Sequence, residues 1–304
     1  MSAGVGGAGA PIGSRSEQVA GVPVGTDAII ERALAEDAPW GDLTSEVFVP
    51  VDAVATAVLD AREPGVLSGL RVAARVFELV DAGIRFEPLA VDGERFAAGA
   101  DLARIAGNAR SVLRAERIAL NLAQRMSGIA TLTAAYVDAV AGTGVRIADT
   151  RKTTPGLRVL ERQAVRDGGG SNHRFSLSDA VMAKDNHLAV LAARGVAIGD
   201  AIREARARLG HTVHLEVEVD RLDQVEEVVA AGVDTILLDN FTLDELRAGV
   251  ALVDGRAIVE ASGGVTLATV GEIARTGVDV ISSGALTHSV RALDLGLDVT
   301  VSGG

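Results

Sequence analysis

The stretch that decides the fold lies between residues 213 and 283. It contains four apolar runs, VHLEVEV at 213–219, TILL at 235–238, AIVEA at 257–261 and VDVI at 278–281. Helical patterns fill the gaps between them, at 222–231, 243–252 and 267–276. Alternation of strand and helix predicts a parallel sheet with right-handed crossovers. We therefore expect an α/β domain, whose first strand is a further apolar run at 145–148.

Polar residues stand at the ends of these runs at a nearly constant interval. Glu218 is followed by Asp239 after 21 residues, by Ser262 after another 23 and by Ser283 after another 21. A (β/α) barrel places its active site at the carboxyl ends of its strands. A doubly wound sheet would need a glycine-rich phosphate turn after its first strand, and the sequence has neither GxGxxG after a strand nor GxxxxGK[ST]. The spacing therefore favours a barrel.

The first half of the chain has a different, strand-rich pattern that is typical of a smaller α+β domain. Its expected strands are at 53–59, 65–68, 84–90 and 101–104, and its expected helices are at 28–34, 70–80 and 109–122. After the last of these helices, Ser127-Gly128 has the character of a break, near which we expect the second domain to begin.

These patterns predict four segments. Residues 1–26 are rich in Gly, Ala and Ser and lack the basic start and apolar core of a signal peptide, so we expect a flexible tail. We assign 27–127 to an N-terminal α/β sandwich domain and 128–289 to the barrel. We expect 290–304 to return to the N-terminal domain.

The composition excludes several classes of protein. The chain is 48% hydrophobic and 23% charged, so it can bury a large core. It has no run of 18 apolar residues, so we expect no membrane-spanning helix. A net charge of −12 and few aromatic residues argue against nucleic acid or an anionic membrane as partner. The chain has no cysteine, which excludes a thiol nucleophile and fits a reducing, cytoplasmic compartment.

Any anionic ligand must then meet a local cluster of positive charge, which residues 151–187 supply. This segment has seven Arg or Lys and four Asp or Glu, a net charge of +3, and it holds both lysines of the chain, Lys152 and Lys184, against 27 arginines. An ammonium is a compact donor that fits where a planar guanidinium does not. With Arg151, His173 and Arg174, the two lysines predict a site for carboxylates or phosphates. The alternative is a solvated basic face.

Arg151 and Lys152 directly follow the first expected barrel strand. Adjacent side chains that leave a strand point to opposite sides. We therefore expect one of the two to reach a ligand while the other braces it.

Two further features fit such a site. Glu218 and Asp239, on successive strands, offer carboxylates that could share Mg²⁺ or Mn²⁺ with a diphosphate, or that could merely neutralise nearby Arg and Lys. The turns at 260–265 and 282–285 consist of small residues and could bind phosphate through backbone N–H groups, or be plain tight turns. His211 and His214 have no convergent carboxylate, so we expect no metal site there.

The sequence resembles the quinolinate phosphoribosyltransferase family over nearly everything that follows the tail. The matching stretches are ED at 36–37, GDLT at 41–44, ER at 116–117 through Asn121 to SGIAT at 127–131, DTRKTTPGLR at 149–158, GGGSNHR at 168–174, DNH at 185–187, EVEV at 216–219, LDN at 238–240, EASGG at 260–264 and GALTH at 284–288. The stretch from 149 to 187 is the most specific of them.

The resemblance implies an enzyme of NAD biosynthesis. Such an enzyme joins quinolinate to phosphoribosyl pyrophosphate and yields nicotinate mononucleotide, CO₂ and pyrophosphate. It implies a homodimer with shared active sites, in which an open α/β N-terminal domain packs against an incomplete, seven-stranded barrel. Because the pyridinium ring that forms is its own electron sink, no PLP, thiamine or nicotinamide cofactor is expected. An enzyme acting on another aromatic acid and a non-catalytic phosphate-ligand binding barrel remain as alternatives.

The resemblance also implies a role for each site residue. Lys152, Lys184, Glu218 and Asp239 would carry the chemistry, with Glu218 and Asp239 holding the ribose hydroxyls and Mg²⁺ (or Mn²⁺). The carboxylates of quinolinate would lie against Arg151, Lys152 and Arg174, with Thr150 and His173 beside them and Lys184 near both substrates. The 5′-phosphate would lie in the turns Ser262-Gly263-Gly264 and Ser283-Gly284-Ala285. Arg117 would come from the partner subunit.

Overall fold

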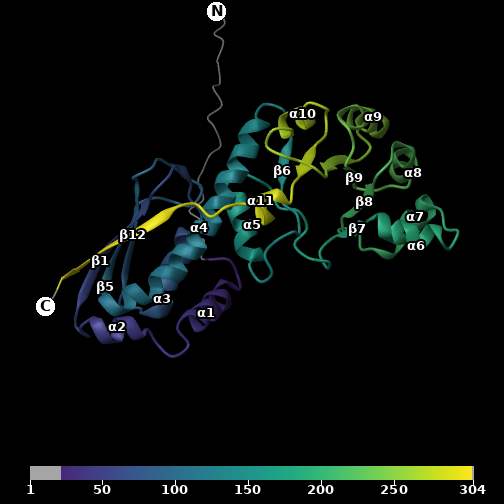
Figure 1. Ribbon diagram of the computed structural model, residues 1–304. Coiled ribbons are helices and arrows are strands. Elements are labelled where there is room, and N and C mark those ends of the chain that lie inside the picture. The colour runs from purple at the N-terminus through teal and green to yellow at the C-terminus, as the bar shows by residue number, and fades with distance from the viewer. Residues whose placement is uncertain (1–21, 303–304) are drawn as a thin grey trace, which may run out of the picture.

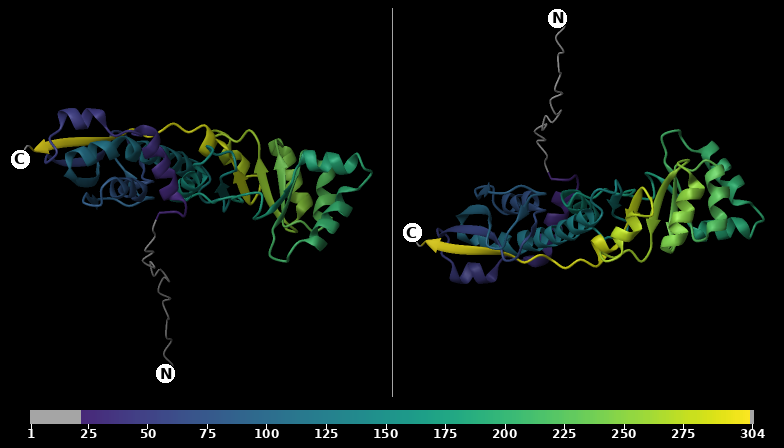
Figure 2. Two further views of the ribbon diagram at one scale, coloured as in Figure 1. Left: turned by 90° about the horizontal axis from the view of Figure 1, so that it is seen from below. Right: turned by 90° about the horizontal axis from the view of Figure 1, so that it is seen from above.

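The computed structural model describes residues 22–302 and consists of two parts connected by the long helix α4 (Ala109–Ala139), as Figure 1 shows. Residues 1–21, most of the predicted tail, lie outside the described residues, and Thr26 already begins helix α1. The two views of Figure 2 show an elongated molecule with the N-terminal sheet at one end and the parallel sheet at the other. Within residues 22–302, no helix has the length and apolar character that a membrane span requires.

The N-terminal part is built on a four-stranded antiparallel sheet. Its strands are β3 (Arg85–Pro88), β5 (Asp101–Asn108), β1 (Val54–Ala61) and β12 (Leu295–Ser302), in the order β12-β1-β5-β3. Every second residue of β1 is buried, as expected for a sheet that has one face against a core. That core also contains residues of α3 (Leu70–Val80) and α4. The remaining elements of this part are α1 (Thr26–Asp37), α2 (Leu43–Phe48) and the small pair β2 (Gly65–Val66) and β4 (Arg95–Phe96).

The last strand of the chain lies next to the first. β12 pairs with β1 along its whole length, from Leu295 opposite Ala61 to Ser302 opposite Val54. Figure 1 shows this yellow strand running back from the barrel into the N-terminal sheet. The N-terminal sheet is thus assembled from both ends of the chain.

Helix α4 does not break at Ser127-Gly128, so this prediction is wrong. The helix begins at the Asn108 cap, whose side chain accepts hydrogen bonds from two backbone N–H groups, and continues for 31 residues. Gly128 is there because the returning chain crosses the helix at that point. A Cβ on Gly128 would lie 2.2 Å from the carbonyl oxygen of Arg291, so only glycine allows this approach.

The second part is an open barrel of parallel strands, which confirms the predicted α/β class. Its strands lie in the order β6-β11-β10-β9-β8-β7. They are β6 (Arg146–Ala148), β7 (Val181–Ala183), β8 (Leu215–Val219), β9 (Thr235–Asp239), β10 (Ile258–Ser262) and β11 (Val280–Ser282). Among the described residues the sheet therefore has six strands rather than the seven that the resemblance implied. Between β6 and β7, Ser171 forms only a single bridge with Ala148.

Short helices connect these strands. They are α5 (Arg158–Asp167), α6 (Asp185–Ala192), α7 (Ile198–Arg208), the 3₁₀ turn η1 (Leu222–Gln224), α8 (Val225–Ala230), α9 (Leu243–Val253), α10 (Val270–Ala274) and α11 (Ala285–His288). The predicted helix at 222–231 is thus divided between η1 and α8, and the one at 267–276 is shorter than expected. Because successive side chains alternate along a strand, Glu216 and Glu218 on β8 face the lumen together, as do Glu260 and Ser262 on β10.

Candidate active site

A cavity of about 400 Å³ opens at the carboxyl ends of the barrel strands. Nine residues that the sequence predicts for the site line it, and four others do so as well. The nine are Thr150, Arg151, Lys152, His173, Arg174, Lys184, Glu218, Asp239 and Ser262. The four others are Met182, Leu237, Glu260 and Ser282. The cavity therefore collects basic and acidic side chains around a small apolar surface.

The buried carboxylate of Asp149 organises the loop that carries His173. Its two oxygens accept hydrogen bonds from the backbone N–H of His173 (2.7 Å) and from Nδ2 of Asn172 (2.7 Å). Nη1 of Arg162 donates to the backbone oxygen of His173 (2.6 Å) and lies 3.6 Å from Asp149. Burial raises the pKa of Asp149, an effect that these donors oppose. These contacts hold the loop that carries His173 in place across the open side of the barrel.

Hydrogen bonds from Arg158 and Thr287 hold the loop that carries Arg151 and Lys152 in place. Arg158 donates to Thr153 Oγ1 (3.0 Å) and to the backbone oxygen of Arg151 (3.4 Å), and Thr287 Oγ1 donates to the backbone oxygen of Lys152 (2.7 Å). β6 ends at Ala148, so Arg151 and Lys152 lie in a turn beyond the strand, and strand alternation does not separate them. Both residues line the cavity.

Positive charge is crowded at this wall of the cavity. Burial and the neighbouring charge of Arg151 lower the pKa of the Arg174 guanidinium, which the charge of Glu216 partly offsets. Nε of Arg151 is buried and has no hydrogen-bond partner among the described residues. The guanidinium groups of Arg151 and Arg174 are complementary to a carboxylate or phosphate. Such an anion would relieve their mutual repulsion and supply the acceptor that Nε of Arg151 lacks.

The opposite wall carries the acids. Lys184, at the N-terminus of α6, forms an ion pair through Nζ with Glu218. Asp239 is the last residue of β9 and accepts a hydrogen bond from Nδ2 of Asn240 (2.6 Å). Both carboxylates are only partly buried and stand on neighbouring strands. Carboxylate oxygens at the rim of an open cavity are ligands suited to Mg²⁺ or Mn²⁺.

The turns after β10 and β11 lie beside the cavity. Gly263 has a φ of 86°, and a Cβ there would lie 2.3 Å from Oδ1 of Asn240, so this turn requires glycine. Gly284 packs against the side chain of Lys152. Ser283 Oγ donates to the backbone oxygen of Val265 (3.4 Å) and accepts from the backbone N–H of Ala285 (3.3 Å). Of the six residues that the resemblance assigns to the 5′-phosphate, only Ser262 lines the cavity itself; Gly263, Gly264, Ser283, Gly284 and Ala285 do not.

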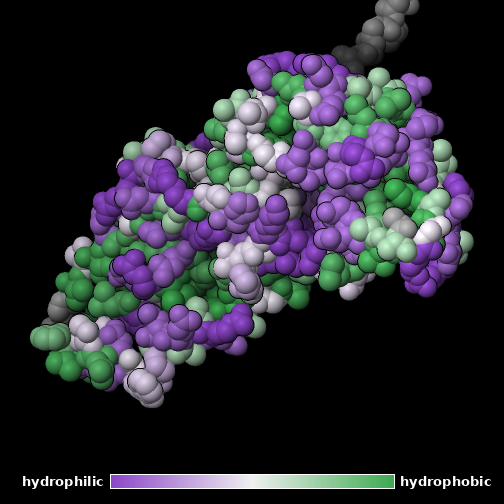
Figure 3. Space-filling view, turned by 45° about the vertical axis from the view of Figure 1, so that its right-hand side comes forward, coloured by the Kyte–Doolittle hydropathy of each residue, from purple (hydrophilic) through white to green (hydrophobic). Residues whose placement is uncertain are grey.

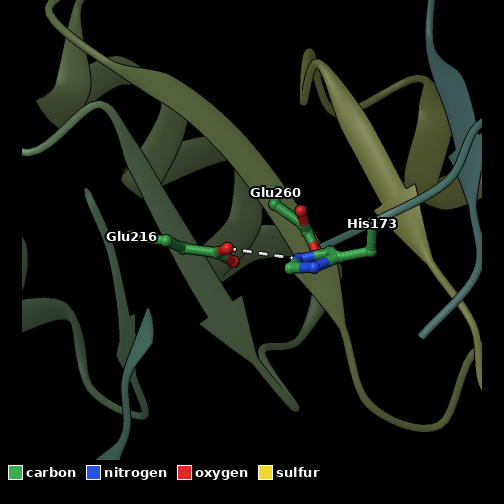
Figure 4. Close-up of side chains that lie close together, drawn as sticks. All are labelled: His173, Glu216 and Glu260. Atoms are coloured by element: carbon green, nitrogen blue, oxygen red, sulfur yellow. Dashed lines mark ion pairs between the residues drawn. The ribbon is translucent and has the colours of Figure 1, made fainter. Parts of the chain in front are cut away.

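A cluster of three titratable side chains, Glu216, Glu260 and His173, lies at the base of the cavity, which His173 and Glu260 line (Figure 4). Nε2 of His173 lies 3.2 Å from Oε2 of Glu216 and 3.5 Å from Oε1 of Glu260. Nδ1 of His173 accepts a hydrogen bond from the backbone N–H of Arg174 (2.8 Å), so the neutral ring carries its proton on Nε2, and a second proton on Nδ1 would have to displace this bond. Burial lowers the pKa of His173, but the hydrogen bonds to the two glutamates and their charges outweigh it and raise that pKa to about 10.

The three side chains have the separation of metal ligands, with their ligand atoms within 4.8 Å of one another. A proton on Nε2, however, leaves this nitrogen no lone pair for a metal ion. We therefore interpret the cluster as hydrogen-bonded, with the ring of His173 held by the protein at both nitrogens.

Arg117 is the predicted site residue that the structure places elsewhere. It lies on α4 with an exposed side chain, 3.9 Å from Glu116, and does not line the cavity of its own chain.

The sequence analysis did not name Met182 and Leu237, and it included Glu260 and Ser282 only as the first residues of the turns at 260–265 and 282–285. A signal for Leu237 and Glu260 was present, because they stand two residues before Asp239 and Ser262 and therefore face the same side of their strands. Met182 carried no comparable signal.

Two family models together match nearly all of the described chain. The model described as "Quinolinate phosphoribosyl transferase, N-terminal domain" matches residues 42–127, and the one described as "Quinolinate phosphoribosyl transferase, C-terminal domain" matches residues 129–298.

Individual proteins agree with these models. The nicotinate-nucleotide pyrophosphorylase (carboxylating) of Mycobacterium leprae is 46% identical over 89% of this chain and 95% of its own. The crystal structure of NadC from Streptococcus pyogenes is similar with a TM-score of 0.86 and 43% identity, over 91% of this chain and 97% of its own. That of the nicotinate-nucleotide pyrophosphorylase of Francisella tularensis is similar with a TM-score of 0.85 and 36% identity, over 90% and 96%. The chain therefore belongs to the quinolinate phosphoribosyltransferase family.

Proposed function

We propose that this protein transfers the phosphoribosyl group of phosphoribosyl pyrophosphate to the ring nitrogen of quinolinate and releases CO₂ and pyrophosphate. The product is nicotinate mononucleotide, an intermediate of de novo NAD biosynthesis. The observation that carries this proposal is one cavity lined by four cations, Arg151, Lys152, Arg174 and Lys184, and by the two rim carboxylates of Glu218 and Asp239. In an enzyme of this family, the cations would bind the anionic substrates, and the carboxylates would bind the ribose and the metal ion.

Quinolinate would lie against the cationic wall. Arg151 and Arg174 offer forked donors to its two carboxylates, and Lys152 adds a third charge, with Thr150 and His173 beside them. Met182 and Leu237 supply the apolar surface against which the ring packs. The cations reduce the repulsion between a dianion and the phosphates of the second substrate, so that two anions can be held side by side.

The acidic wall would hold the ribose. Glu218 and Asp239 are placed to accept hydrogen bonds from its hydroxyls and fit as ligands of Mg²⁺ or Mn²⁺, because both offer partly exposed carboxylate oxygens at the same rim. When bound there with the diphosphate, the cation neutralises the charge of the leaving group. Lys184 lies between the two walls, where its ammonium can serve both substrates.

The 5′-phosphate would lie in the two turns beside the rim, Ser262-Gly263-Gly264 and Ser283-Gly284-Ala285. Small residues leave their backbone N–H groups accessible to phosphate oxygens.

The chemistry then needs no organic cofactor. The C1–pyrophosphate bond breaks and leaves positive charge at the ribose, which the ring nitrogen of quinolinate attacks. The nitrogen becomes a quaternary cation, which stabilises the electron pair that stays on C2 when the adjacent carboxylate leaves as CO₂, and C2 then takes up a proton from water. The side chains of this protein orient the two substrates and stabilise the charges that develop.

A second copy of the chain would complete each site. Arg117 projects from α4 outside its own cavity, where it is available to a neighbouring subunit. Trp40, Val47 and Phe48 are also exposed, Trp40 at 92%. Figure 3 shows hydrophobic residues gathered on the N-terminal part, at the left, whereas the barrel end at the right is mostly hydrophilic. We infer a cytoplasmic homodimer with shared active sites that binds neither nucleic acid nor membrane.

The deciding experiment is release of labelled CO₂ from quinolinate labelled in its carboxyl groups. We expect release that depends on both phosphoribosyl pyrophosphate and Mg²⁺, with equimolar nicotinate mononucleotide. A protein that binds both compounds and releases no CO₂ would be a binding protein, and one that ribosylates only another aromatic acid would be an enzyme of different specificity. Either result would overturn the proposal.

A further inference from the structure

Two carboxylates lie in the lumen of the barrel, one layer below the rim. Glu216 precedes the rim residue Glu218 by two positions on β8, and Glu260 precedes Ser262 by two on β10. Each glutamate is only 4% exposed. The middle layer of a barrel is ordinarily filled by branched aliphatic side chains. Burying a charge there is costly, so packing alone does not explain this pair.

The cluster of Glu216, Glu260 and His173 is negative in either protonation state of the imidazole. With His173 protonated, one positive charge faces two negative ones; with the ring neutral, the charge of Arg174 still acts on Glu216, and Glu260 loses its counter-charge in the cluster. Oε1 of Glu216 is buried without a hydrogen-bond partner among the described residues, and Oε1 of Glu260 has only the contact of 3.5 Å with Nε2 of His173 there. We refer to these three side chains as the acidic floor.

The acidic floor separates two spaces. Glu260 and His173 border the rim cavity and also a second cavity of about 380 Å³ that reaches the amino ends of the strands, where Arg146 and Thr235 lie. Figure 4 shows Glu216 and Glu260, on two different strands, approaching the ring of His173. The rim cavity thus has guanidinium, ammonium and carboxylate groups around its mouth and the carboxylate of Glu260 at its base, next to that of Glu216, which borders the second cavity.

We infer that Glu216 and Glu260 determine which aromatic dicarboxylates the cavity accepts and in which orientation. A carboxylate that enters the base of the cavity meets like charge in a low-dielectric environment, which is strongly unfavourable. A ring whose two carboxylates are adjacent can turn both toward Arg151 and Arg174 and present a bare edge to the floor. An isomer whose carboxylates stand apart presents one of them to the floor. This inference rests on the proposed function.

The test compares binding of pyridine-2,3-dicarboxylate, which is quinolinate, with binding of the 2,4-, 2,5- and 2,6-dicarboxylates, by calorimetry on the full chain. The variants are Glu260→Gln and Glu216→Gln, which remove one charge and keep the shape. The matched control is Glu226→Gln, which makes the same change on the outer helix α8, where Glu226 pairs with Arg256. Circular dichroism verifies the fold of each variant.

We expect the wild type to bind quinolinate most tightly. In Glu260→Gln and in Glu216→Gln, the affinity of at least one separated isomer should rise relative to that of quinolinate by fivefold or more, and Glu226→Gln should leave all ratios unchanged. If the affinity ratios of the isomers to quinolinate stay within twofold of the wild-type ratios in the folded variants among Glu216→Gln and Glu260→Gln, the inference is overturned. A wild type that binds all four isomers equally would do so as well. A wild type that does not bind quinolinate would instead contradict the proposed function.

Discussion

Arg125 and Glu161 form a largely buried ion pair that connects α4 with the loop carrying the cationic residues of the site. Nη2 of Arg125 lies 2.8 Å from Oε1 of Glu161, and the other carboxylate oxygen accepts from the backbone N–H of Thr154 (3.1 Å). The side chain of Glu161 is 1% exposed. The helix that joins the two parts of the molecule therefore also positions Arg151 and Lys152.

Removing one partner of this pair should destabilise the protein strongly. Arg125→Met leaves the Glu161 carboxylate buried without its counter-charge, and we expect the free energy of unfolding in urea to fall by about 3 kcal/mol. Arg208→Met is the matched control, because Arg208 forms an exposed pair with Glu204, and such pairs contribute less than about 1 kcal/mol. Equal losses in the two variants would show that burial of the pair is irrelevant.

The protonation of His173 predicts a pH dependence of stability. Its pKa in the folded protein is about 10, above the ordinary value of 6.5, so the native state binds the proton more tightly than the unfolded chain. The stabilisation is complete below pH 6.5 and is lost as the pH rises toward 10, by up to about 1.4 kcal/mol per pH unit. Glu260→Gln removes one of the two carboxylates, so urea titrations from pH 6.5 to 9.5 should show a flatter decline. An identical slope in wild type and variant would contradict the assignment.

Asp239→Asn should separate turnover from quinolinate binding. Asp239 lies on the acidic wall, where we place the ribose and the metal ion, so we expect kcat/KM for phosphoribosyl pyrophosphate to fall by about 100-fold or more. The Kd of quinolinate alone, measured by calorimetry, should change by less than about threefold because Arg151 and Arg174 are untouched. Similar losses in both quantities would place Asp239 at the quinolinate site instead.

Lys184→Arg tests the rarity of lysine in this chain. Both lysines line the cavity, whereas the 27 other basic positions are Arg. Arginine keeps the charge but replaces a compact ammonium by a wider planar group, so kcat/KM should fall by about tenfold or more. The reciprocal change Arg203→Lys, on the exposed surface of α7, should have no effect. Near-wild-type activity of Lys184→Arg would refute the argument from lysine scarcity.

Arg117 and Lys184 together test whether the active site is shared. Arg117→Ala and Lys184→Ala subunits should each be inactive as homodimers. In a mixed dimer with shared sites, one site holds both defects and the other neither. A statistical mixture should therefore recover about a quarter of wild-type activity, if the sites are independent and subunits exchange fully. Recovery near zero, with mixed dimers confirmed by differential tagging and mass spectrometry, would assign Arg117 to its own subunit.

The sequence predicted the regular part of the barrel because each strand there is a continuous apolar run with a polar residue at its end. Glu218, Asp239 and Ser262 were placed at the rim in this way. The segment from 158 to 208 was not resolved into elements, and α5, β7, α6 and α7 were missed. β7 has only three residues, and all of them are half-buried, so its composition carries little signal. Helix α5 is dominated by charged side chains that hold loops rather than face solvent, as Arg162 does.

Long-range contacts account for most of the other differences. Gly128 has the signature of a helix break, but its role is to let the chain near Arg291 cross α4, a contact between residues more than 160 positions apart. Glu216 and Glu260 gave no sign of their role, because nothing in their neighbourhood along the chain shows that His173 enters the lumen between them. Local patterns identify elements and strand ends, whereas the acidic floor exists only after the barrel has formed.

The pairing of β12 with β1 has a consequence for biosynthesis. During translation, β1 emerges from the ribosome long before its partner, so the N-terminal sheet stays incomplete until residues 295–302 have been added. Throughout that interval one side of β1 is an unpaired strand edge, which can pair with other chains. Pairing of such distant segments is also slow, because closing a long loop costs entropy before any contact is made. The nascent chain should therefore depend on chaperones, and a ribosome that stops before residue 295 would release a protein with a completed barrel and an unfinished N-terminal sheet.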